Sequence, residues 1–265
     1  MVLSAEITEW IEELQDPIII PLEQVESLCS WLQTRRSFSH PGIVIGPSGT
    51  GKTLAISYYL DTSQSHSYSA SKSIVLLKSP SGCDIRAFYL SLIETLYRPV
   101  FERRSTYQLR SDAWGFLQTY HVNQLIIDDA DRLKPSTFPD LRDISDRLNI
   151  SVILVANQSL EKKIAKDECM KTRFRSSFQM NPLTQDQFVK ALFMLAQSIF
   201  RCELNMSDKE FLFALRSHCQ LSIKILDETL RYIALYHLQN GCTSFSTKLV
   251  KETFFSLVQN NCTSI

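Results

Sequence analysis

The sequence predicts an α/β fold in which a parallel sheet is flanked by helices and followed by a small all-helical lid domain. Short apolar runs alternate with helical patterns, a glycine-rich segment follows the first run, and only helical patterns occur after Pro182. Strands that alternate with helices at this spacing form parallel sheets covered on both faces. We therefore divide the chain into an N-terminal helical segment (1–40), an α/β core (41–181) and a helical lid with a C-terminal tail (182–265).

The N-terminal segment is predicted to form two helices ahead of the first strand. Residues 6–15 and 21–36 have helical patterns, and Pro17 lies between them. Proline ends a helix because it lacks the N–H donor and clashes with the preceding turn. The apolar run 43–45 is bounded by turn residues and is short enough to be a buried strand.

The next elements alternate between helix and strand. A helix is predicted over 54–60, directly after the glycine-rich segment, and the serine-rich residues 61–72 are predicted to be a loop. The apolar run 74–77 predicts a second strand, and helical patterns follow at 84–98 and 105–120.

The core ends with two further strands and the helix between them. Residues 125–127 form a third apolar run that ends in Asp128, residues 138–148 predict a helix, and residues 152–156 predict a fourth strand. The predicted lid helices are 184–200, 207–217, 222–239 and 246–259.

Composition excludes several classes of protein. Of the 265 residues, 44% are hydrophobic and 21% are charged, which suits a folded globular chain. No run reaches the roughly 18 apolar residues of a membrane helix, and no secretory signal is visible, so we expect a cytoplasmic protein. Seven scattered cysteines without a CxxC pair fit reduced thiols better than disulfides or a zinc site. The net charge of zero means that any nucleic-acid contact must come from a local basic patch.

The glycine-rich segment has the pattern of a phosphate-binding loop between a strand and a helix. It reads Gly46, Pro47, Ser48, Gly49, Thr50, Gly51, Lys52 and Thr53. The glycines allow a tight turn whose N–H groups point at phosphate oxygens, and the following helix N-terminus adds positive potential. Lys52 is expected to reach the β- and γ-phosphates, and the Thr53 hydroxyl to bind Mg²⁺. The predicted cofactors are therefore ATP and Mg²⁺.

A second motif ends the third strand. Asp128 follows the buried run 125–127 and is expected to hold Mg²⁺, directly or through water. Asp129 stands at the position of a water-activating carboxylate. Its side chain is one methylene shorter than the usual glutamate, and general-base catalysis depends on reach. We therefore expect slow hydrolysis.

Four further residues are candidates for nucleotide contact. Asn157 follows the fourth strand and could orient water or contact the γ-phosphate, although asparagine is also common in turns. Arg173 and Arg175 could stabilise charge on a neighbouring subunit's phosphate, or could simply lie on the surface. Lys224 lies in an apolar stretch, where it could reach the nucleotide or extend its amine to solvent.

The candidate basic patch lies between residues 98 and 110. Arginines alternate there with Ser105, Thr106 and Tyr107, and only Glu102 interrupts the positive charge. Such residues contact phosphates, and a solvated helix connection is the alternative interpretation.

Around these motifs the sequence resembles the AAA+ regulators of DNA transposition, the TnsC/TniB group, and most closely TnsC of the CRISPR-associated transposons. The stretch that carries the resemblance is Ile127-Asp128-Asp129-Ala130-Asp131-Arg132-Leu133-Lys134-Pro135. Ile20-Pro21-Leu22-Glu23 ahead of the loop and Arg173-Phe174-Arg175 after the fourth strand agree with it. The resemblance covers residues 9 to about 235.

The resemblance implies an ATP-dependent protein that binds duplex DNA without sequence preference and assembles with itself into rings or helical filaments. It implies two partners, a TniQ-type target selector, often with an RNA-guided complex, and a transposase of TnsB or TnsAB type. It places Asn157 at sensor 1, Lys224 at sensor 2, and Arg173 or Arg175 at the arginine finger, without choosing between the two arginines.

The same resemblance implies two DNA-facing loops, near 78–86 and 103–107. The candidate DNA-binding residues there are Lys78, Arg103, Arg104, Ser105 and Thr106. Two alternatives stay open for the chain as a whole. One is another AAA+ class, such as a loader-like or signalling ATPase, and the other is a P-loop kinase for a small molecule.

Overall fold

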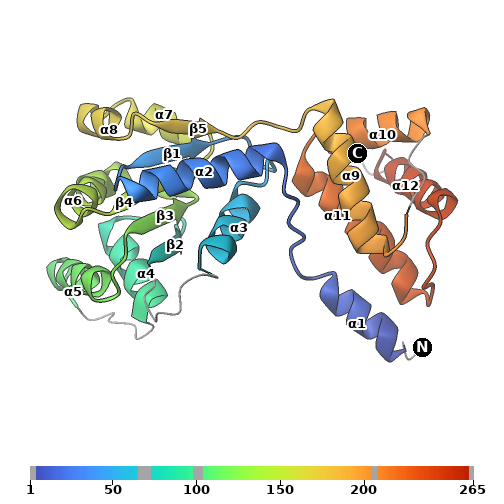
Figure 1. The fold of residues 1–265 in the computed structure, drawn as a ribbon, viewed down its shortest axis with the longest axis horizontal. Coiled ribbons are helices and arrows are strands. Elements are labelled where there is room, and N and C mark those ends of the chain that lie inside the picture. Colours follow the sequence, from blue (N-terminus) through green and yellow to red (C-terminus); the bar gives the residue numbers. More distant parts are fainter. Residues whose placement is uncertain (1–3, 65–72, 98–103, 204–207, 263–265) are drawn as a thin grey trace. The chain divides into compact units, whose positions relative to one another are not determined.

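The computed structural model describes residues 4–64, 73–97, 104–203 and 208–262 (Figure 1). By their contacts these residues form two compact units. The sheet unit comprises residues 23–48 and 55–181, and the helical unit comprises residues 1–22, 49–54 and 182–265. The chain therefore passes from one unit to the other within the glycine-rich loop.

The sheet unit is built on five parallel strands. They are β1 (Gly42–Ile45), β2 (Ile74–Lys78), β3 (Gln124–Asp128), β4 (Ser151–Ala156) and β5 (Ser177–Gln179). Their order is β2-β3-β4-β1-β5, so β1 lies between β4 and β5. Every residue of β1, β3 and β4 is buried, which explains why these strands are continuous apolar runs.

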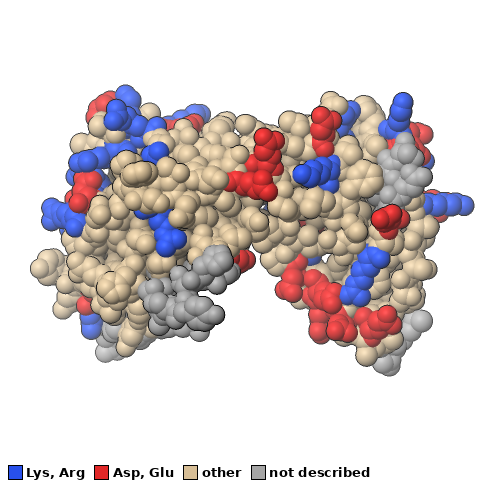
Figure 2. All heavy atoms as spheres, in the orientation of Figure 1, with Lys and Arg blue, Asp and Glu red and all other residues tan. Residues whose placement is uncertain are grey.

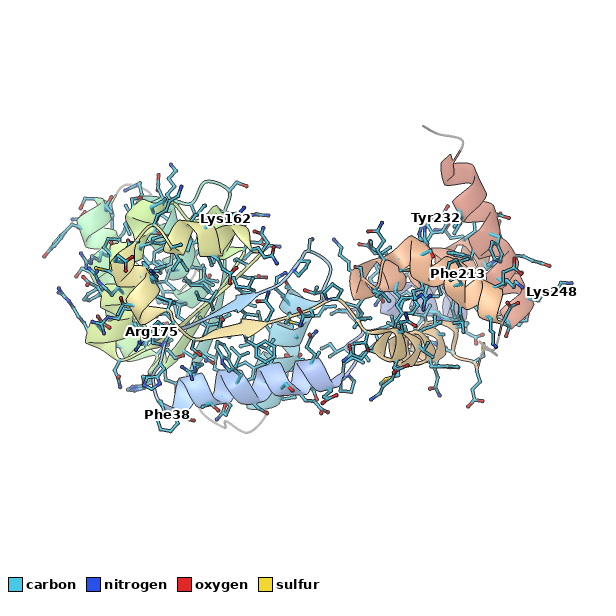
Figure 3. The ribbon with its side chains drawn as sticks, turned by 90° about the horizontal axis from the view of Figure 1, so that it is seen from above. Phe38, Lys162, Arg175, Phe213, Tyr232 and Lys248 are labelled. Atoms are coloured by element: carbon cyan, nitrogen blue, oxygen red, sulfur yellow. The ribbon has the colours of Figure 1, made fainter. Side chains whose placement is uncertain are left out.

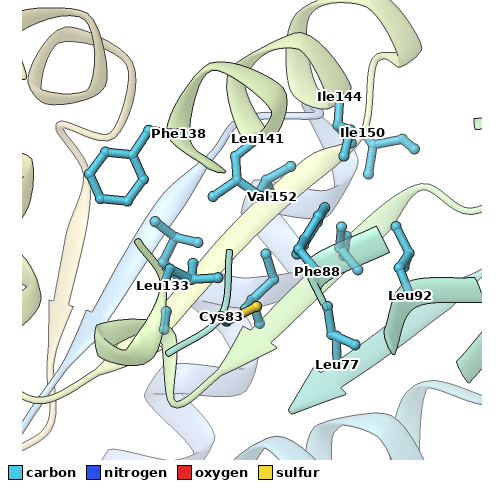
Figure 4. Close-up of a cluster of buried hydrophobic side chains, with 14 of the residues drawn as sticks. Leu77, Cys83, Phe88, Leu92, Leu133, Phe138, Leu141, Ile144, Ile150 and Val152 are labelled. Carbon is cyan, nitrogen blue, oxygen red and sulfur yellow. The ribbon is translucent and has the colours of Figure 1, made fainter. Parts of the chain in front are cut away.

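Seven helices of the described chain accompany these strands. They are α2 (Glu23–Ser37), α3 (Lys52–Gln64), α4 (Ile85–Tyr97), α5 (Thr106–Thr119), α6 (Phe138–Leu148), α7 (Ser159–Ile164) and α8 (Glu168–Arg173). Phe88 and Leu92 of α4 and Leu141 of α6 are fully buried in one cluster with Val152 of β4 (Figure 4). This packed layer holds the strands, and therefore the loops at their ends, in a fixed arrangement.

The helical unit contains α1 (Ala5–Glu13), α9 (Gln185–Phe200), α10 (Lys209–Cys219), α11 (Ile223–Gln239) and α12 (Thr247–Cys262). Thr184 and Gln187 form a capping box at the start of α9, and Ser222 accepts a hydrogen bond from the Ile225 N–H at the start of α11. The Trp10 indole N–H donates to the Ile199 carbonyl oxygen at 3.1 Å, which joins α1 to α9.

The predicted fold class is confirmed, and four local predictions need correction. The sequence patterns missed β5, α7 and α8, and the helix after the loop extends to Gln64 rather than ending at residue 60. Three- and six-residue elements are too short to display a period of 2 or 3.6. Among the helices described, none is both long and apolar enough to cross a membrane.

A buried polar network ties the sheet to α2 and α3. Gln124 of β3 is fully buried. Its amide nitrogen donates to the Leu32 carbonyl oxygen at 3.0 Å, and its amide oxygen accepts from the Tyr59 hydroxyl at 2.9 Å. Burial raises the pKa of Tyr59, so the phenol remains a proton donor at neutral pH.

Replacing Gln124 with leucine should therefore destabilise the chain, because it removes the buried hydrogen bonds that join β3 to the Leu32 carbonyl and to the Tyr59 hydroxyl. We expect a loss of about 1–3 kcal/mol in the free energy of unfolding, measured by urea denaturation. Gln118→Leu on the exposed face of α5 is the matched control and should change stability little. Equal effects from the two substitutions would contradict this account of the network.

Candidate nucleotide-binding site

The glycine-rich loop leaves the sheet through a gap that only glycine fits. The Gly46 N–H donates to the Ala156 carbonyl oxygen at 3.2 Å, so the chain is still held against β4 where β1 ends. A Cβ atom on residue 46 would lie 2.3 Å from the Met180 carbonyl oxygen, which follows β5. Glycine at 46 is therefore required by the backbone on the β5 side of β1.

The loop then turns with positive φ angles and enters α3. Gly49 has φ +82° and Gly51 has φ +84°, both in the region that favours glycine. Lys52 and Thr53 are the first two residues of α3, which continues for 13 residues to Gln64. The helix dipole gives this end of a helix a positive potential. Backbone turn, helix end and lysine thus converge on one anion-binding function.

Within the helical unit, this loop contacts the start of α11. The Ser222 hydroxyl and the Lys224 backbone N–H both donate to the Gly49 carbonyl oxygen, at 3.1 and 3.3 Å. The Lys224 side chain lies 3.7 Å from Glu228 and is 63% exposed. The contact with Gly49 therefore comes from the backbone of Lys224, while its amine is engaged in an exposed ion pair.

Asp128 and Asn157 lie at the edge of the sheet from which the loop emerges. Asp128 is the last residue of β3, and Asn157 directly follows β4 as Gly46 follows β1. Asp128 is 4% exposed, and one carboxylate oxygen accepts from the Asp129 N–H at 2.9 Å. The exposed Asn157 side chain accepts from the Ser159 N–H at 2.8 Å, which is a turn-forming contact. This bond uses the amide oxygen, whereas the predicted sensor role would use the amide nitrogen as a donor to phosphate.

Asp129 is engaged by a neighbour on the same turn. It has φ 52° and ψ 37°, and its carboxylate lies 3.2 Å from the Arg132 guanidinium. The predicted water-activating group is therefore ion-paired in this structure. Sequence reasoning did not anticipate this pairing, although the Asp-x-x-Arg spacing within one turn is visible in the sequence.

The residues present fit a nucleotide with a bound magnesium ion. A hydroxyl and a carboxylate, from Thr53 and Asp128, are ligand types that Mg²⁺ prefers, and the glycines form a cradle that a Cβ would fill. Ser79 adds an independent sign. Its N–H donates to the Asp128 carbonyl oxygen at 3.0 Å, and its own hydroxyl is buried with no partner among the described residues. Buried hydroxyls normally have a partner, so a ligand or ordered water is expected beside Asp128.

Arg173 and Arg175 lie at the opposite edge of the sheet. Both line a pocket of about 610 Å³ that is also lined by Arg35, His40 and Asp146. The pocket sits where β1, β4 and β5 begin, whereas the glycine-rich loop follows the end of β1. Figure 3 labels Arg175 and Phe38 at this end of the sheet unit.

The arginines of this pocket differ in their pairing. Arg173 forms an ion pair with Asp146 at 2.9 Å. The Arg35 guanidinium lies 5.5 Å from the Trp31 ring centre, and its Nε is buried without a hydrogen-bond partner among the described residues. Figure 2 shows further basic side chains gathered over α7 and α8 and acidic ones over α1. The pocket is therefore a cationic feature, and Arg35 is a member that sequence patterns did not reveal.

The predicted DNA-facing residues are only partly grouped. Arg103 lies outside the described residues. Arg104 is ion-paired with Asp112, and its backbone carbonyl accepts from the Arg86 guanidinium. Ser105 caps α5, and Thr106 is the first residue of that helix. Lys78 ends β2 with an exposed side chain.

The first of the predicted DNA-facing loops, 78–86, also carries an acid. The Ala87 N–H bond, together with Lys134, holds the pKa of Asp84 below its usual range. Its negative charge counts against close approach of a DNA phosphate at that point.

Comparison with known proteins gives the same fold. Residues 36–164 match a family model described as an AAA domain. The fold is the AAA+ P-loop fold. Comparison with curated proteins found no match.

Similar AAA+ structures include three archaeal proteins. The ORC1 protein of Aeropyrum pernix in complex with DNA has a TM-score of 0.68 and 13% identity, covering 91% of this chain and 66% of that one. The ORC2 protein of the same organism has a TM-score of 0.66 and 13% identity, covering 91% and 71%. Cdc6p of Pyrobaculum aerophilum has a TM-score of 0.66 and 19% identity, covering 88% and 67%. Identities this low establish the AAA+ fold alone.

The steric gap at Gly46 gives a direct test of the loop. Gly46→Ala should abolish ATP binding, because the new Cβ forces either the loop or the Met180 backbone to move. Binding of a fluorescent ATP analogue would measure the loss.

Gly115→Ala is the matched control for this substitution. Gly115 lies inside α5 with no atom within 4 Å of the added Cβ, so alanine should stabilise the helix by about 0.5–1 kcal/mol and leave binding intact. Normal ATP binding by Gly46→Ala would contradict the assignment of the loop.

Proposed function

We propose that this chain is an ATP-dependent DNA-binding regulator of transposition. It assembles with itself on target duplex DNA and links a TniQ-type target selector to a transposase of TnsB or TnsAB type. The AAA+ fold supports the ATP-dependent part of this proposal, and the similarity of residues 127–135 to the TnsC/TniB group supports the transposition role. Whether the selector is guided by a CRISPR complex is a finer part of the same proposal.

The nucleotide chemistry follows from the residues of the loop and of β3. Lys52 and the loop N–H groups would hold the phosphates of ATP, and Thr53 and Asp128 would hold Mg²⁺. Bound Mg²⁺ supplies neutralising charge on the phosphates. In hydrolysis, the oxygen of a water bonds to the γ-phosphorus while the bond to the β–γ bridging oxygen breaks, and Asp129 would accept the water's proton. The short reach of Asp129 and its pairing with Arg132 both favour slow turnover.

The position of the arginine pocket supports assembly and is the observation on which the proposal chiefly rests. Arg173 and Arg175 lie where β1 begins, and the loop emerges where β1 ends. Four residues of strand separate these edges by about 13 Å. An arginine at the starting edge is therefore poorly placed for its own subunit's phosphates. It could serve the nucleotide of a neighbour in a head-to-tail assembly.

DNA binding through a polymer is consistent with the zero net charge. Among the described residues, the candidate DNA-facing patch holds two basic side chains, Lys78 and Arg104, and Arg104 is already paired. Repetition of that patch along an assembly would multiply weak phosphate contacts. Contacts to phosphates alone carry little sequence information, which suits a protein whose target is chosen by a partner.

A loader-like AAA+ ATPase is the second candidate function. The structural similarity to ORC and Cdc6 proteins favours it, since one of those structures is a DNA complex. Both candidates require ATP-dependent assembly on DNA. They differ in the partner, so recruitment of a transposase to DNA by the ATP-bound assembly would favour the first and its absence the second.

Action of an arginine across the subunit interface predicts complementation between two inactive variants. Lys52→Ala loses its own nucleotide site but keeps the pocket, while Arg175→Ala keeps the site but loses a pocket arginine. Each alone should hydrolyse ATP at least roughly a thousandfold more slowly than wild type. A mixture should recover a clear fraction of the activity, since some interfaces combine the intact halves.

The control for this mixing experiment is Lys162→Ala, an exposed basic residue on α7 outside the pocket, which should retain full activity (Figure 3). If the mixture hydrolyses ATP no faster than the two variants do separately, Arg175 does not act at a site shared between subunits. Repeating the mixture with Arg173→Ala would show which arginine acts across the interface.

Assembly on DNA should require the triphosphate. Sedimentation with duplex DNA of arbitrary sequence should give large complexes with ATP or a slowly hydrolysed analogue, and none with ADP or with Lys52→Ala. Lys78→Ala should weaken DNA binding at every sequence tested and reduce its salt dependence. Monomers under all conditions would argue against both candidate functions.

A further inference from the structure

The turn that follows Asp128 is held rigidly from two sides. The Lys163 amine of α7 donates to the carbonyl oxygens of Asp131 and Leu133, the latter at 3.1 Å. The Lys134 N–H donates to the Cys83 carbonyl oxygen at 2.8 Å, and the Leu133 side chain is fully buried. Because the backbone is anchored by α7, by the core and by the segment before α4, side-chain rotation is the main freedom left in this turn.

Within this turn, Arg132 faces back toward Asp129. The Arg132 N–H donates to the Asp129 carbonyl oxygen at 3.0 Å, which closes the turn. The left-handed backbone of Asp129, with φ 52° and ψ 37°, accompanies an ion pair of 3.2 Å between its carboxylate and the Arg132 guanidinium. The two side chains are 34% and 43% exposed, so the pair is open to solvent and can be broken.

We propose that Arg132 is a positioning residue that restrains the Asp129 carboxylate and thereby slows ATP hydrolysis. This inference rests on the proposed function of Asp129 as the group that accepts a proton from water. A general base must present a free lone pair to the water that it deprotonates. In the ligand-free chain, Arg132 engages one carboxylate oxygen of a side chain whose reach is already short.

The strength of the ion pair limits the effect. Exposed pairs contribute little free energy, and breaking one before each turnover slows hydrolysis by about two- to fivefold. Such a restraint would lengthen the life of the ATP-bound state without blocking turnover. Any anion that pairs with Arg132 would release it.

Steady-state ATPase measurements on Arg132→Ala test the proposal. We expect kcat to rise about two- to fivefold while KM for ATP stays constant, because no phosphate contact is removed. Arg132→Lys keeps the positive charge and should give a kcat between the two. Arg147→Ala is the matched control, since Arg147 forms an exposed pair with Asp143 at 3.6 Å on α6, and its kcat should equal that of wild type.

A second readout uses the ligand-free chain. Urea unfolding of Asp129→Asn, Arg132→Ala and the double variant forms a double-mutant cycle. Restraint of Asp129 by Arg132 predicts non-additive effects, equivalent to about a two- to fivefold coupling in the unfolding equilibrium. This measurement requires neither nucleotide nor assembly.

The outcomes separate this proposal from the function on which it rests. An unchanged or lower kcat in Arg132→Ala, beside normal wild-type hydrolysis, overturns the restraint. Additive effects in the ligand-free cycle also overturn it. A wild-type chain that binds no ATP overturns the proposed function instead, and the cycle still decides whether Arg132 holds Asp129.

Discussion

The close approach of three strand ends around residue 46 is the constraint on which the site depends. β1 lies between β4 and β5, so the chain that leaves it passes between Ala156 and Met180. A hydrogen bond to Ala156 holds residue 46 on one side, and the Met180 carbonyl excludes a Cβ on the other. The same packing that forms the middle of the sheet therefore fixes where the phosphate-binding loop begins. Because Asp128 and Asn157 follow strands of the same sheet, their backbones are positioned by that packing too.

A parallel sheet has two different edges, and the chain uses both. The ends of β1, β3 and β4 carry the loop, the acid and the asparagine, and the starts of β1, β4 and β5 surround the arginine pocket. Groups that we propose to bind anions thus lie at opposite edges of one sheet. A single subunit cannot bring both edges to one phosphate, whereas a row of subunits in the same orientation can. This polarity explains why the proposed activity depends on assembly. If the bound nucleotide controls whether subunits assemble, the presence of the assembly signals to other proteins that ATP is bound.

The sequence predicted the long buried strands and the motifs at their ends, because apolar runs and glycine spacing are local properties. It did not predict β5, whose three residues alternate between exposed and half-buried positions. The sequence also did not predict which charged side chains pair with one another. Arg104 is held by Asp112 and Arg173 by Asp146, and these pairings depend on how helices pack. The predicted basic patch stays a prediction, and Arg103 lies outside the described residues.

The proposed slow hydrolysis would have two independent physical sources in this chain, and both would act through the same carboxylate. Aspartate in place of glutamate makes the side chain at residue 129 one methylene shorter, and the ion pair with Arg132 engages one oxygen of its carboxylate. The first effect is permanent, whereas the second is reversible because the pair is exposed to solvent. The short side chain would help a regulator that must persist on DNA until its partners arrive. The reversible ion pair would help one that must later dissociate. The turn after β3 could therefore serve both to hold and to release, with Lys163 keeping its backbone constant while the carboxylate changes partner.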